Sequence, residues 1–467
     1  MVAHKVAGAP VDYVALRDEL AVPGDFAYPV LADAERAVAD VRLPDEDASD
    51  IAFVTVDPAG SRDLDQAVHI AADGDGYLVS YAIADVAAFV RPGLPVDDEA
   101  QRRGETLYFP DKRVPLHPPS LSEGAASLLP GELRPAVLWQ MRLGPDGEVT
   151  RFDVRRARVR SRAQLDYATL QTQLNAGSAP PAVALLEEVG TRRMALALRR
   201  NAINLDLPEQ EVVADGGHRW TLALRKPLPV ESWNAEISLL TGMCAAQLML
   251  RAGTGILRTV PEPSADAVAT LRRAASALGI DWPHGASPGA VLAHVDRGDA
   301  RHVAFIEHAA SLLRGAAYTA FDGEPPAERM HAGVGGAYAH VTAPLRRLVD
   351  RFGSEICLAA QSGTPVPQWV RDRLPQLPQT MADADRRAHE IDRAVIDTTE
   401  AWLLRDRVGE TFSVTVVDAD PHAATVVVDE PAIRARCTGD RLQVGQVIRA
   451  TLAEADVAKR HVRFEAQ

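Results

Sequence analysis

The spacing of apolar residues changes along the chain, and each change predicts a different kind of structure. Over residues 77–90 and 135–162, β-branched and aromatic residues alternate with polar ones, which is typical of strands. From about residue 164 the apolar spacing is near 3.6, which predicts amphipathic helices. Another long helix is predicted around residues 380–407. The order of these patterns indicates strands first and helices afterwards within one large unit.

A second strand-rich segment follows Gly409, where five short apolar runs with turn signals lie close together. This pattern predicts a small Greek-key barrel of OB type over residues 405–467. Residues 1–47 carry two short amphipathic patterns separated by a Pro-Gly pair, which predict a small helical cap; a helix-turn-helix-like arrangement is one alternative. We therefore expect an α+β protein of three domains, with the central domain over residues 48–404.

The composition is that of a soluble globular protein, with 47% hydrophobic and 24% charged residues among 467. The cysteines are far apart and show no CxxC spacing, which disfavours a zinc site and a disulfide framework and fits a reducing compartment. No signal-peptide pattern and no uninterrupted apolar run of about 18 residues is present. We therefore expect a cytoplasmic protein that does not cross a membrane.

The net charge of −14 argues against a protein that coats nucleic acid with its whole surface. It does not exclude a basic channel inside an acidic shell, because arginines cluster in the segment RRARVRSR at residues 155–162. Solvated basic faces would explain the same clusters without any nucleic acid. Charge alone therefore leaves both interpretations open.

Three carboxylates and an amide lie close together where a predicted strand meets a Pro-Ala-Gly turn. They are Asp57, Asp63, Asp65 and Gln66. A solvated acidic loop is the interpretation that needs no ligand, and a calcium loop of EF-hand type is excluded because Ser61 and Arg62 interrupt its pattern and no glutamate closes it. A magnesium site is the remaining chemical interpretation, since Mg²⁺ prefers a few carboxylates together with water and phosphate oxygens and would relieve their repulsion.

The acidic segment reads D-x5-D-x-D-Q-A, and several further blocks follow it in order: IADVAAFVRPG, LYFPDKR, RSRAQLDYATLQ, AEISLLTGMCAAQL and YAHVTAPLRRLVD. These segments resemble the RNase II family of exoribonucleases, whose signature reads D-x5-D-x-D-D-A. The resemblance covers about residues 50–400, and the C-terminal barrel resembles the S1-like domain of the family. It implies an RNB catalytic domain, with a mixed sheet and surrounding helices, followed by an S1-like OB-fold barrel.

The resemblance also implies a reaction: Mg²⁺-dependent 3′→5′ hydrolysis of single-stranded RNA to nucleoside 5′-monophosphates. One or two Mg²⁺ ions, or Mn²⁺, would be bound by the acidic segment, with Asp57 and Asp65 as the first candidates, Asp63 close by and Gln66 in the fourth position. Arg346 matches the family arginine that contacts the scissile phosphate, and a planar guanidinium suits the charge that develops there. Its neighbour Arg347 is a further candidate.

Other positions match family residues that hold the RNA. An exonuclease must bind unpaired bases without reading their sequence, which aromatic stacking achieves. The candidates for RNA contact are Tyr108, Tyr167, Trp220, Glu236 and Glu390, together with Arg160 and Arg162 as expected lining of the RNA passage. For each of these side chains, an ordinary role in the core or on the surface is the alternative. The partner is expected to be the 3′ end of a single strand, and the family resemblance implies a monomer.

Two departures from the family pattern limit these expectations. Gln66 stands where the family has a fourth acid, so one metal ligand is uncharged unless a neighbour such as Asp85 compensates. Only about 47 residues precede the catalytic domain, where the family usually has two cold-shock-type barrels, so duplexes with short 3′ tails also become candidate substrates. The alternatives are a catalytically weakened RNA-binding protein on the same fold, a nuclease with relaxed sugar specificity such as a DNA exonuclease, and an endonuclease on the same scaffold.

Overall fold

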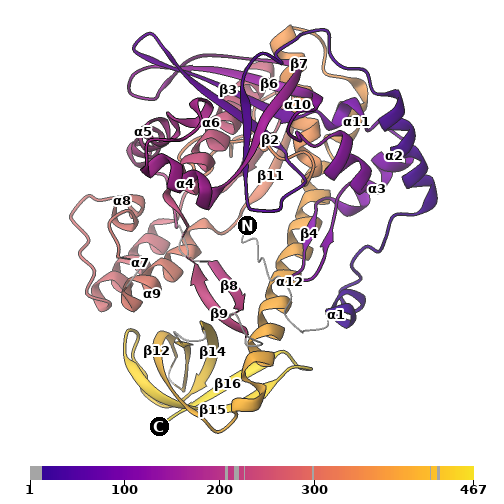
Figure 1. Ribbon diagram of the computed structural model, residues 1–467. Coiled ribbons are helices and arrows are strands. Elements are labelled where there is room, and N and C mark those ends of the chain that lie inside the picture. Colours follow the sequence, from indigo (N-terminus) through magenta and orange to yellow (C-terminus); the bar gives the residue numbers. More distant parts are fainter. Residues whose placement is uncertain are drawn as a thin grey trace.

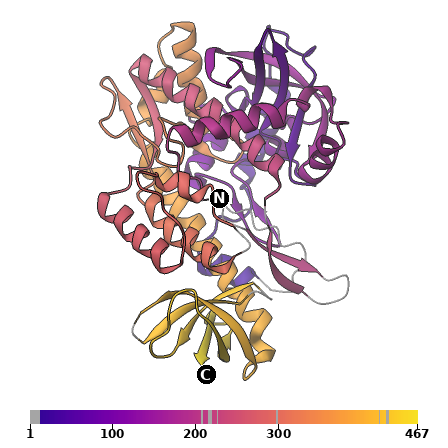
Figure 2. The ribbon, with the colours of Figure 1, turned by 90° about the vertical axis from the view of Figure 1, so that its left-hand side faces the viewer.

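The computed structural model describes residues 13–205, 209–214, 220–225, 227–296, 299–420, 422–428 and 432–467. Two closed barrels lie at opposite ends of the molecule, and the long helix α12 (Leu377–Leu404) runs from the first toward the second (Figure 1). Figure 2 shows the same arrangement after a 90° turn, with the C-terminal barrel below the rest of the chain. The predicted α+β class is confirmed.

The first barrel contains both parallel and antiparallel strand pairs. Its strands are β1 (Phe53–Asp57), β2 (Gln66–Asp73), β3 (Gly76–Ala84), β6 (Leu133–Leu143) and β7 (Val149–Asp166). β1 and β7 close the barrel as a parallel pair, and the other neighbours are antiparallel. Tyr81 and Trp139 lie in one hydrophobic core, whereas Ala82 and Leu138 lie in another. Both faces of these strands are therefore buried, which explains their nearly continuous apolar sequence.

Helices cover this barrel and extend it toward the second one. Those that pack around it are α3 (Pro95–Arg103), α4 (Tyr167–Asn175), α5 (Leu186–Arg199), α6 (Pro229–Ala252), α10 (Leu348–Ser362) and α11 (Gln368–Arg373). Those that lie closer to the second barrel are α7 (Ala265–Ala277), α8 (Pro288–Leu292) and α9 (Ala300–Ala309). Short helical turns are η1 (Val86–Ala88), η2 (Leu121–Ala125), η3 (Pro181–Val183), η4 (Ala310–Leu313) and η5 (Arg405–Arg407).

Helix α6 shows why these segments are helical. Its first turn is held by the Leu228 N–H, which donates to Glu231 Oε1 at 2.8 Å, and it ends at Gly253, where φ is +71°. Gly242 allows the chain at Tyr338 to approach, because a Cβ there would lie 2.2 Å from a ring carbon of Tyr338. This close approach fixes the segment that leads to Arg346.

The described residues between the two barrels also form three two-stranded sheets. They are β4 (Leu107–Tyr108) with β5 (Arg113–Val114), β8 (Glu209–Ala214) with β9 (Trp220–Arg225), and β10 (Thr254–Thr259) with β11 (Ala317–Asp322). The β4–β5 hairpin reaches from the first barrel to α12, where Leu107 and Phe109 share a core with Ile391. This hairpin carries Tyr108 and connects the site to the helix that supports the second barrel.

The two helices predicted near the N-terminus are confirmed as α1 (Val14–Glu19) and α2 (Tyr28–Asp40), but they belong to different cores. Leu16 of α1 packs with Phe109 and Ile391, whereas Val30 of α2 packs against the first barrel. Figure 1 shows the two helices well separated. A helix-turn-helix-like unit, which needs two helices packed on each other, is therefore not what the described residues form.

The C-terminal barrel has the predicted OB-type organisation. Its strands are β12 (Thr411–Ala419), β13 (Ala423–Val428), β14 (Ile433–Thr438), β15 (Val447–Asp456) and β16 (His461–Ala466), and they close in the order β12-β13-β14-β16-β15. Phe412 and Phe464 pack on each other inside it, with ring centroids 5.5 Å apart. Because both of its aromatic rings are internal, any RNA contact of this barrel must be mainly electrostatic.

Candidate active site

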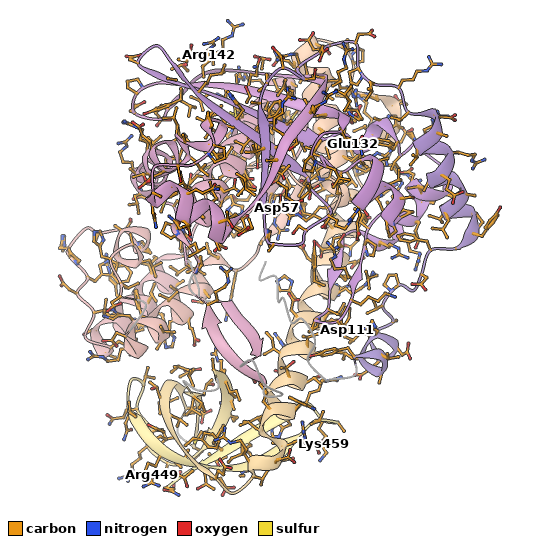
Figure 3. All side chains as sticks on the ribbon, in the orientation of Figure 1. Asp57, Asp111, Glu132, Arg142, Arg449 and Lys459 are labelled. Atoms are coloured by element: carbon orange, nitrogen blue, oxygen red, sulfur yellow. The ribbon has the colours of Figure 1, made fainter. Side chains whose placement is uncertain are left out.

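The acidic segment is the connection between β1 and β2, and its backbone is held at its centre. Asp57 ends β1 and Gln66 begins β2. Leu64 is fully buried, and its N–H donates to Ser127 Oγ at 3.0 Å, while the same hydroxyl donates to the Arg62 carbonyl at 2.6 Å. This anchor fixes the backbone between Asp63 and Asp65, and the two carboxylates are close enough for Asp63 to raise the pKa of Asp65. Figure 3 shows Asp57 at the lower end of the first barrel, on the side of the C-terminal barrel.

Asp65 and Arg346 lie 281 residues apart in sequence and are in direct contact. Arg346 Nε lies 3.2 Å from Asp65 Oδ2, and the Leu345 N–H donates to Asp65 Oδ1 at 2.7 Å. Asp65 is 3% exposed, and burial raises its pKa to about 8 against the lowering effects of Arg346 and the Leu345 N–H. In contrast, 44% of the Arg346 side chain is exposed. The buried Asp65 carboxylate therefore holds a guanidinium that remains accessible to solvent.

The loop that carries Arg346 is fixed at both ends. Asp350 Oδ1 accepts from the Ala343 N–H at 2.7 Å, and both carboxylate oxygens accept from Arg347 at 2.8 Å. The Arg346 carbonyl accepts from the Thr106 N–H at 2.9 Å, so this loop also supports the strand that leads to Tyr108. The Arg347 guanidinium is thus engaged in holding the loop, which accounts for it without the RNA contact expected from sequence.

Two of the predicted aromatic residues lie beside these charges. Burial raises the pKa of Tyr108 to about 12, and Arg346, Asp63 and Asp65 are the charges that act on it. Burial likewise raises the pKa of Tyr167 to about 12, with Asp57 as the next contribution. Tyr167 begins α4, and its hydroxyl lies 3.4 Å from Asn234 Nδ2. The structure therefore gathers both tyrosines with the acidic segment.

Asp63 is held by an arginine that the sequence analysis missed. Arg113 Nη1 forms an ion pair with Asp63, and its Nη2 donates to Glu123 at 3.2 Å. Arg113 is paired in register with Tyr108 across the β4–β5 hairpin. The family resemblance places LYFPDKR as one block, and the strand register across it was the signal that could have connected Arg113 to the acids.

The Gln66 amide makes two hydrogen bonds within the protein, and its expected role as a metal ligand stays a prediction. Its Nε2 donates to the Thr342 carbonyl, and its Oε1 accepts from the Tyr81 hydroxyl at 3.1 Å. That hydroxyl also lies 2.8 Å from Ser238 Oγ. The amide thus joins β2, β3, α6 and the segment before Arg346. Asp85 does not compensate as a metal ligand, because its carboxylate is buried and lies 2.7 Å from Arg156 Nε.

Other predicted residues are not gathered at the site. Glu236 is buried on α6 with Arg193 and Arg200 acting on it, whereas Asn234 and Ser238, one turn apart, face Tyr167 and Tyr81. Two positions along a helix correspond to a rotation of about 200°, so Glu236 faces the α5 side. A helical wheel of α6 would have identified Asn234 and Ser238.

The remaining candidates have different surroundings. Arg162 donates to the Ser49 carbonyl at 2.7 Å and so binds the segment before β1, whereas Arg160 is half-buried on the same strand. Glu390 is exposed on α12. The Trp220 side chain lies outside the described residues, although its backbone belongs to β9. The RNA contacts expected of these four residues stay predictions.

The acidic segment offers few donors for a metal ion. Within the part of the chain that the structure describes, no three Asp, Glu, His or Cys side chains are grouped to hold one metal ion. Asp57 and Asp65 both act electrostatically on Arg346, so they share one small region. Mg²⁺ is often held by one or two carboxylates and completed by water and substrate phosphate oxygens, so this donor set fits such a site.

Comparison with known proteins identifies two domains. The RNB domain model matches residues 45–354, and the RNase II-type exonuclease C-terminal S1 domain model matches residues 410–467. Ribonuclease R of Escherichia coli is 28% identical over 83% of this chain and 51% of its own length, and Exoribonuclease 2 of Serratia proteamaculans is 27% identical over 81% and 60%. The chain thus spans between half and two thirds of these relatives.

A solved structure shows the same fold at lower sequence identity. The apo form of Mycoplasma genitalium RNase R superposes with a TM-score of 0.86 at 20% identity, covering 97% of this chain and 77% of the other. Among the described residues, no helix is long and apolar enough to cross a bilayer. Because the RNB model covers most of the chain, the protein belongs to the RNB-domain family and carries an RNase II-type C-terminal S1 domain.

Proposed function

We propose that this protein is a divalent-metal-dependent 3′→5′ exoribonuclease that hydrolyses single-stranded RNA to nucleoside 5′-monophosphates. The observation that carries this proposal is the contact between the buried Asp65 and the accessible Arg346, with Tyr108 and Tyr167 beside them. Curated relatives that cover most of this chain are named Ribonuclease R and Exoribonuclease 2, which supports the same reaction class.

Arg346 is suited to hold the scissile phosphate. A guanidinium has five N–H donors, and among the described residues the only ion pair of Arg346 uses Nε, toward Asp65. Its terminal amino groups can therefore donate to non-bridging phosphate oxygens and stabilise the charge that develops on them. Asp65 keeps the guanidinium oriented, so the arginine need not be reordered when RNA arrives.

The other residues position the strand. Tyr108 and Tyr167 offer ring faces on which bases at the 3′ end can stack, at about 1–3 kcal/mol per base. Mg²⁺ bound by Asp57 and Asp65 would supply a water-derived nucleophile and neutralise phosphate charge. Asp63 is held back by Arg113, which keeps it near the site while limiting the repulsion among the three acids.

The test incubates the full chain with end-labelled single-stranded RNA, with and without Mg²⁺. We expect shortening from the 3′ end and release of nucleoside 5′-monophosphates only with the metal. Asp65→Asn should lower the rate by about 10²-fold or more, because the carboxylate that orients Arg346 loses its charge, while RNA binding stays within a few fold. The matched control is Asp73→Asn, which changes a surface carboxylate on the other end of β2.

A substrate series tests how the RNA enters. Duplexes with 3′ tails from zero to twelve nucleotides should be degraded only when a tail is present, because the strand must reach Arg346 unpaired. Rapid degradation of blunt duplexes would contradict this entry route. DNA and circular RNA substrates address sugar specificity and endonuclease activity in the same assay.

A second candidate function is supported by Gln66, whose amide is engaged by Thr342 and Tyr81 in place of a fourth acid. Under this alternative, the protein binds RNA on an RNB fold without cleaving it at a useful rate. Wild-type protein that binds the labelled RNA but leaves it intact over hours with Mg²⁺ or Mn²⁺ would favour this alternative over the exonuclease.

A further inference from the structure

A half-open cavity of about 360 Å³ is lined by residues that the proposed reaction does not use. They come from the segment between α2 and β1, from η1 and the residues after it, and from β7, α10 and α11. Its volume is at the lower end of the range for small-molecule sites, about 300–1,000 Å³. That volume suits one small ligand rather than an RNA strand.

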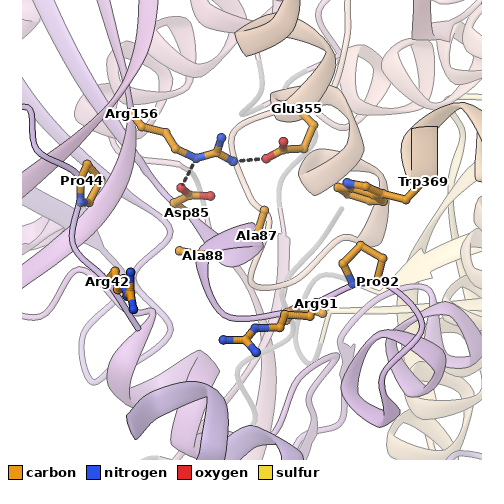
Figure 4. A pocket seen from close by; sticks show the side chains of 11 residues that line it. Arg42, Pro44, Asp85, Ala87, Ala88, Arg91, Pro92, Arg156, Glu355 and Trp369 are labelled. Atoms are coloured by element: carbon orange, nitrogen blue, oxygen red, sulfur yellow. Dashed lines mark hydrogen bonds and ion pairs between the residues drawn. The ribbon is translucent and has the colours of Figure 1, made fainter. Parts of the chain in front are cut away.

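The charges on one side of the cavity are already paired. Arg156 Nε lies 2.7 Å from Asp85 Oδ2, and its Nη2 forms an ion pair with Glu355 (Figure 4). Asp85 and Glu355 are 2% and 7% exposed. This bridge holds β7, the end of β3 and α10 together, so a ligand would meet it as a neutral or weakly charged wall.

Two further arginines bring positive charge that is not neutralised. The Arg42 side chain forms no hydrogen bond or ion pair with any residue that the structure describes. Among the same residues, the Arg91 side chain forms one ion pair, with Asp40 at 3.9 Å, and the Arg91 and Asp40 side chains are 63% and 62% exposed. Such an exposed, distant pair contributes little. Figure 4 shows Arg91 extending along the edge of the cavity toward the side on which Arg42 lies. In a chain of net charge −14, two weakly paired arginines at one cavity favour an anion.

The opposite side of the cavity is flat and apolar. Trp369 is half-buried there, packed against Phe352 at 5.2 Å between ring centroids, with the Arg351 guanidinium 4.6 Å from its ring. Pro92 lies beside Trp369, Ala87 and Ala88 line the middle of the cavity, and Pro44 lies on the side of Arg42 (Figure 4). Trp369 is therefore fixed in place by its neighbours while part of it remains available to an aromatic ligand.

We propose that this cavity binds a nucleoside 5′-monophosphate, with the phosphate between Arg42 and Arg91 and the base against Trp369 and Pro92. A dianionic phosphate needs the two guanidiniums, and a heterocycle needs the aromatic and apolar wall; a nucleotide carries both groups at a separation that one small cavity can span. The site is distinct from the active site and follows from the cavity itself. Only its link to the reaction product rests on the proposed function.

The position of the cavity connects it to the active site. Asp85 directly follows Ala84, whose N–H donates to the Asp65 carbonyl at 2.9 Å. Glu355 lies on α10, whose first turn carries the Asp350 that holds the Arg346 loop. A nucleotide bound beside the Asp85–Arg156–Glu355 bridge would therefore touch supports of both Asp65 and Arg346.

The test is equilibrium dialysis of the full chain with labelled AMP in EDTA, in an Arg346→Ala background that removes the active-site cation. We expect saturable binding at one site, and at least tenfold weaker binding in Arg42→Ala/Arg91→Ala. The control double variant Arg273→Ala/Arg314→Ala removes the same charge from exposed positions elsewhere and should bind as the parent does. Thermal melts of all variants check that each is folded.

Two further measurements decide the ligand class. Inorganic phosphate and adenosine should each bind at least tenfold more weakly than AMP, and Trp369→Phe should remove most of the AMP-dependent change in tryptophan fluorescence. Unchanged AMP affinity in the Arg42/Arg91 double variant would overturn the site. Phosphate binding as tightly as AMP would overturn the nucleotide assignment in favour of a simple anion site. Because activity is not measured, failure here is separable from failure of the exonuclease assay.

Discussion

The substitution Gln66→Glu separates two roles for the residue that replaces the fourth family acid. If Gln66 is a metal ligand of reduced charge, a carboxylate at this position should strengthen Mg²⁺ binding. If it is the joint seen in the structure, the same change removes the donor that Gln66 Nε2 supplies to the Thr342 carbonyl. Glutamate has nearly the same shape as glutamine, so the substitution tests the donor and the charge without opening a cavity.

The contacts of Gln66 determine how much stability the substitution should cost. A net protein hydrogen bond contributes about 0.5–1.5 kcal/mol, and leaving a buried acceptor unsatisfied costs about 1–3 kcal/mol. The Thr342 residue is 3% exposed, and the new carboxylate would also stand next to the buried Asp65. We therefore expect metal-free Gln66→Glu to lose about 2–3 kcal/mol of the free energy of unfolding, and the Arg346 loop to become less well held.

The assay is urea unfolding in EDTA, followed by tryptophan fluorescence, with a Mg²⁺ titration of activity alongside. Gln164→Glu is the matched control, because Gln164 Nε2 also donates to a carbonyl, that of Ser61 at 2.7 Å, but on the exposed surface. It should lose less than about 1 kcal/mol. Equal losses in the free energy of unfolding for the two substitutions would show that Gln66 does not join these segments. A Gln66→Glu protein of unchanged stability whose activity needs less Mg²⁺ at the titration midpoint would instead indicate that Gln66 is a metal ligand.

Three more outcomes are expected. Arg17→Ala and Asp111→Asn each break the contact in which Arg17 Nη1 donates to both Asp111 carboxylate oxygens, at 2.7 and 2.9 Å, and which braces the β4–β5 hairpin. Each substitution should therefore lower kcat several-fold, and the double variant should be no worse than either single one; additive losses would contradict the brace. Burial raises the pKa of Glu105 from 4.5 to about 7, so the stability that its protonated form contributes is fully present below pH 4.5 and lost as the pH rises through 7. The free energy of unfolding of Glu105→Gln, relative to that of the wild type, should therefore rise by up to about 3 kcal/mol between pH 4.5 and 8. If the free energies of unfolding of the two proteins change with pH in parallel, this prediction is wrong. Deleting residues 410–467 should weaken RNA binding and flatten its salt dependence, because fewer counterions are released, and an unchanged slope of log Kd against log salt would exclude the barrel as an RNA contact.

The sequence could predict the elements and the gathering of distant motifs, because both leave regular signals. The barrel strands follow from period-two apolar patterns, and Asp65 was connected with Arg346 only through blocks that occur in family order. Side-chain direction leaves no such signal. Whether Gln66 points at a metal or at Thr342 depends on the position of a segment 276 residues away, and whether Arg347 meets RNA or Asp350 depends on how its loop turns into α10.

The arginines on the surface of the first barrel also have partners that the sequence could not predict. The cluster at residues 155–162 suggested a basic passage for RNA. In the structure, Arg156 joins Asp85 to Glu355, and Arg158 joins Asp47 at 2.8 Å. These guanidiniums hold the barrel to the segments around it, and most of their charge is neutralised by acids that are distant in sequence. Counting basic residues along a strand therefore overestimates the positive potential that RNA would meet.

The contacts around Asp65 explain how segments far from the acids can influence them. Asp65 holds the Leu345–Arg346 backbone, and the Arg346 carbonyl holds Thr106, two residues before Tyr108. The hairpin that follows is braced by α1 and packs against α12, which continues into the C-terminal barrel. RNA bound to that barrel would therefore act, through α12 and the hairpin, on the loop that positions Arg346. We therefore expect that loss of the N-terminal helix or of the barrel changes kcat as well as RNA affinity, because both support the loop that carries Arg346.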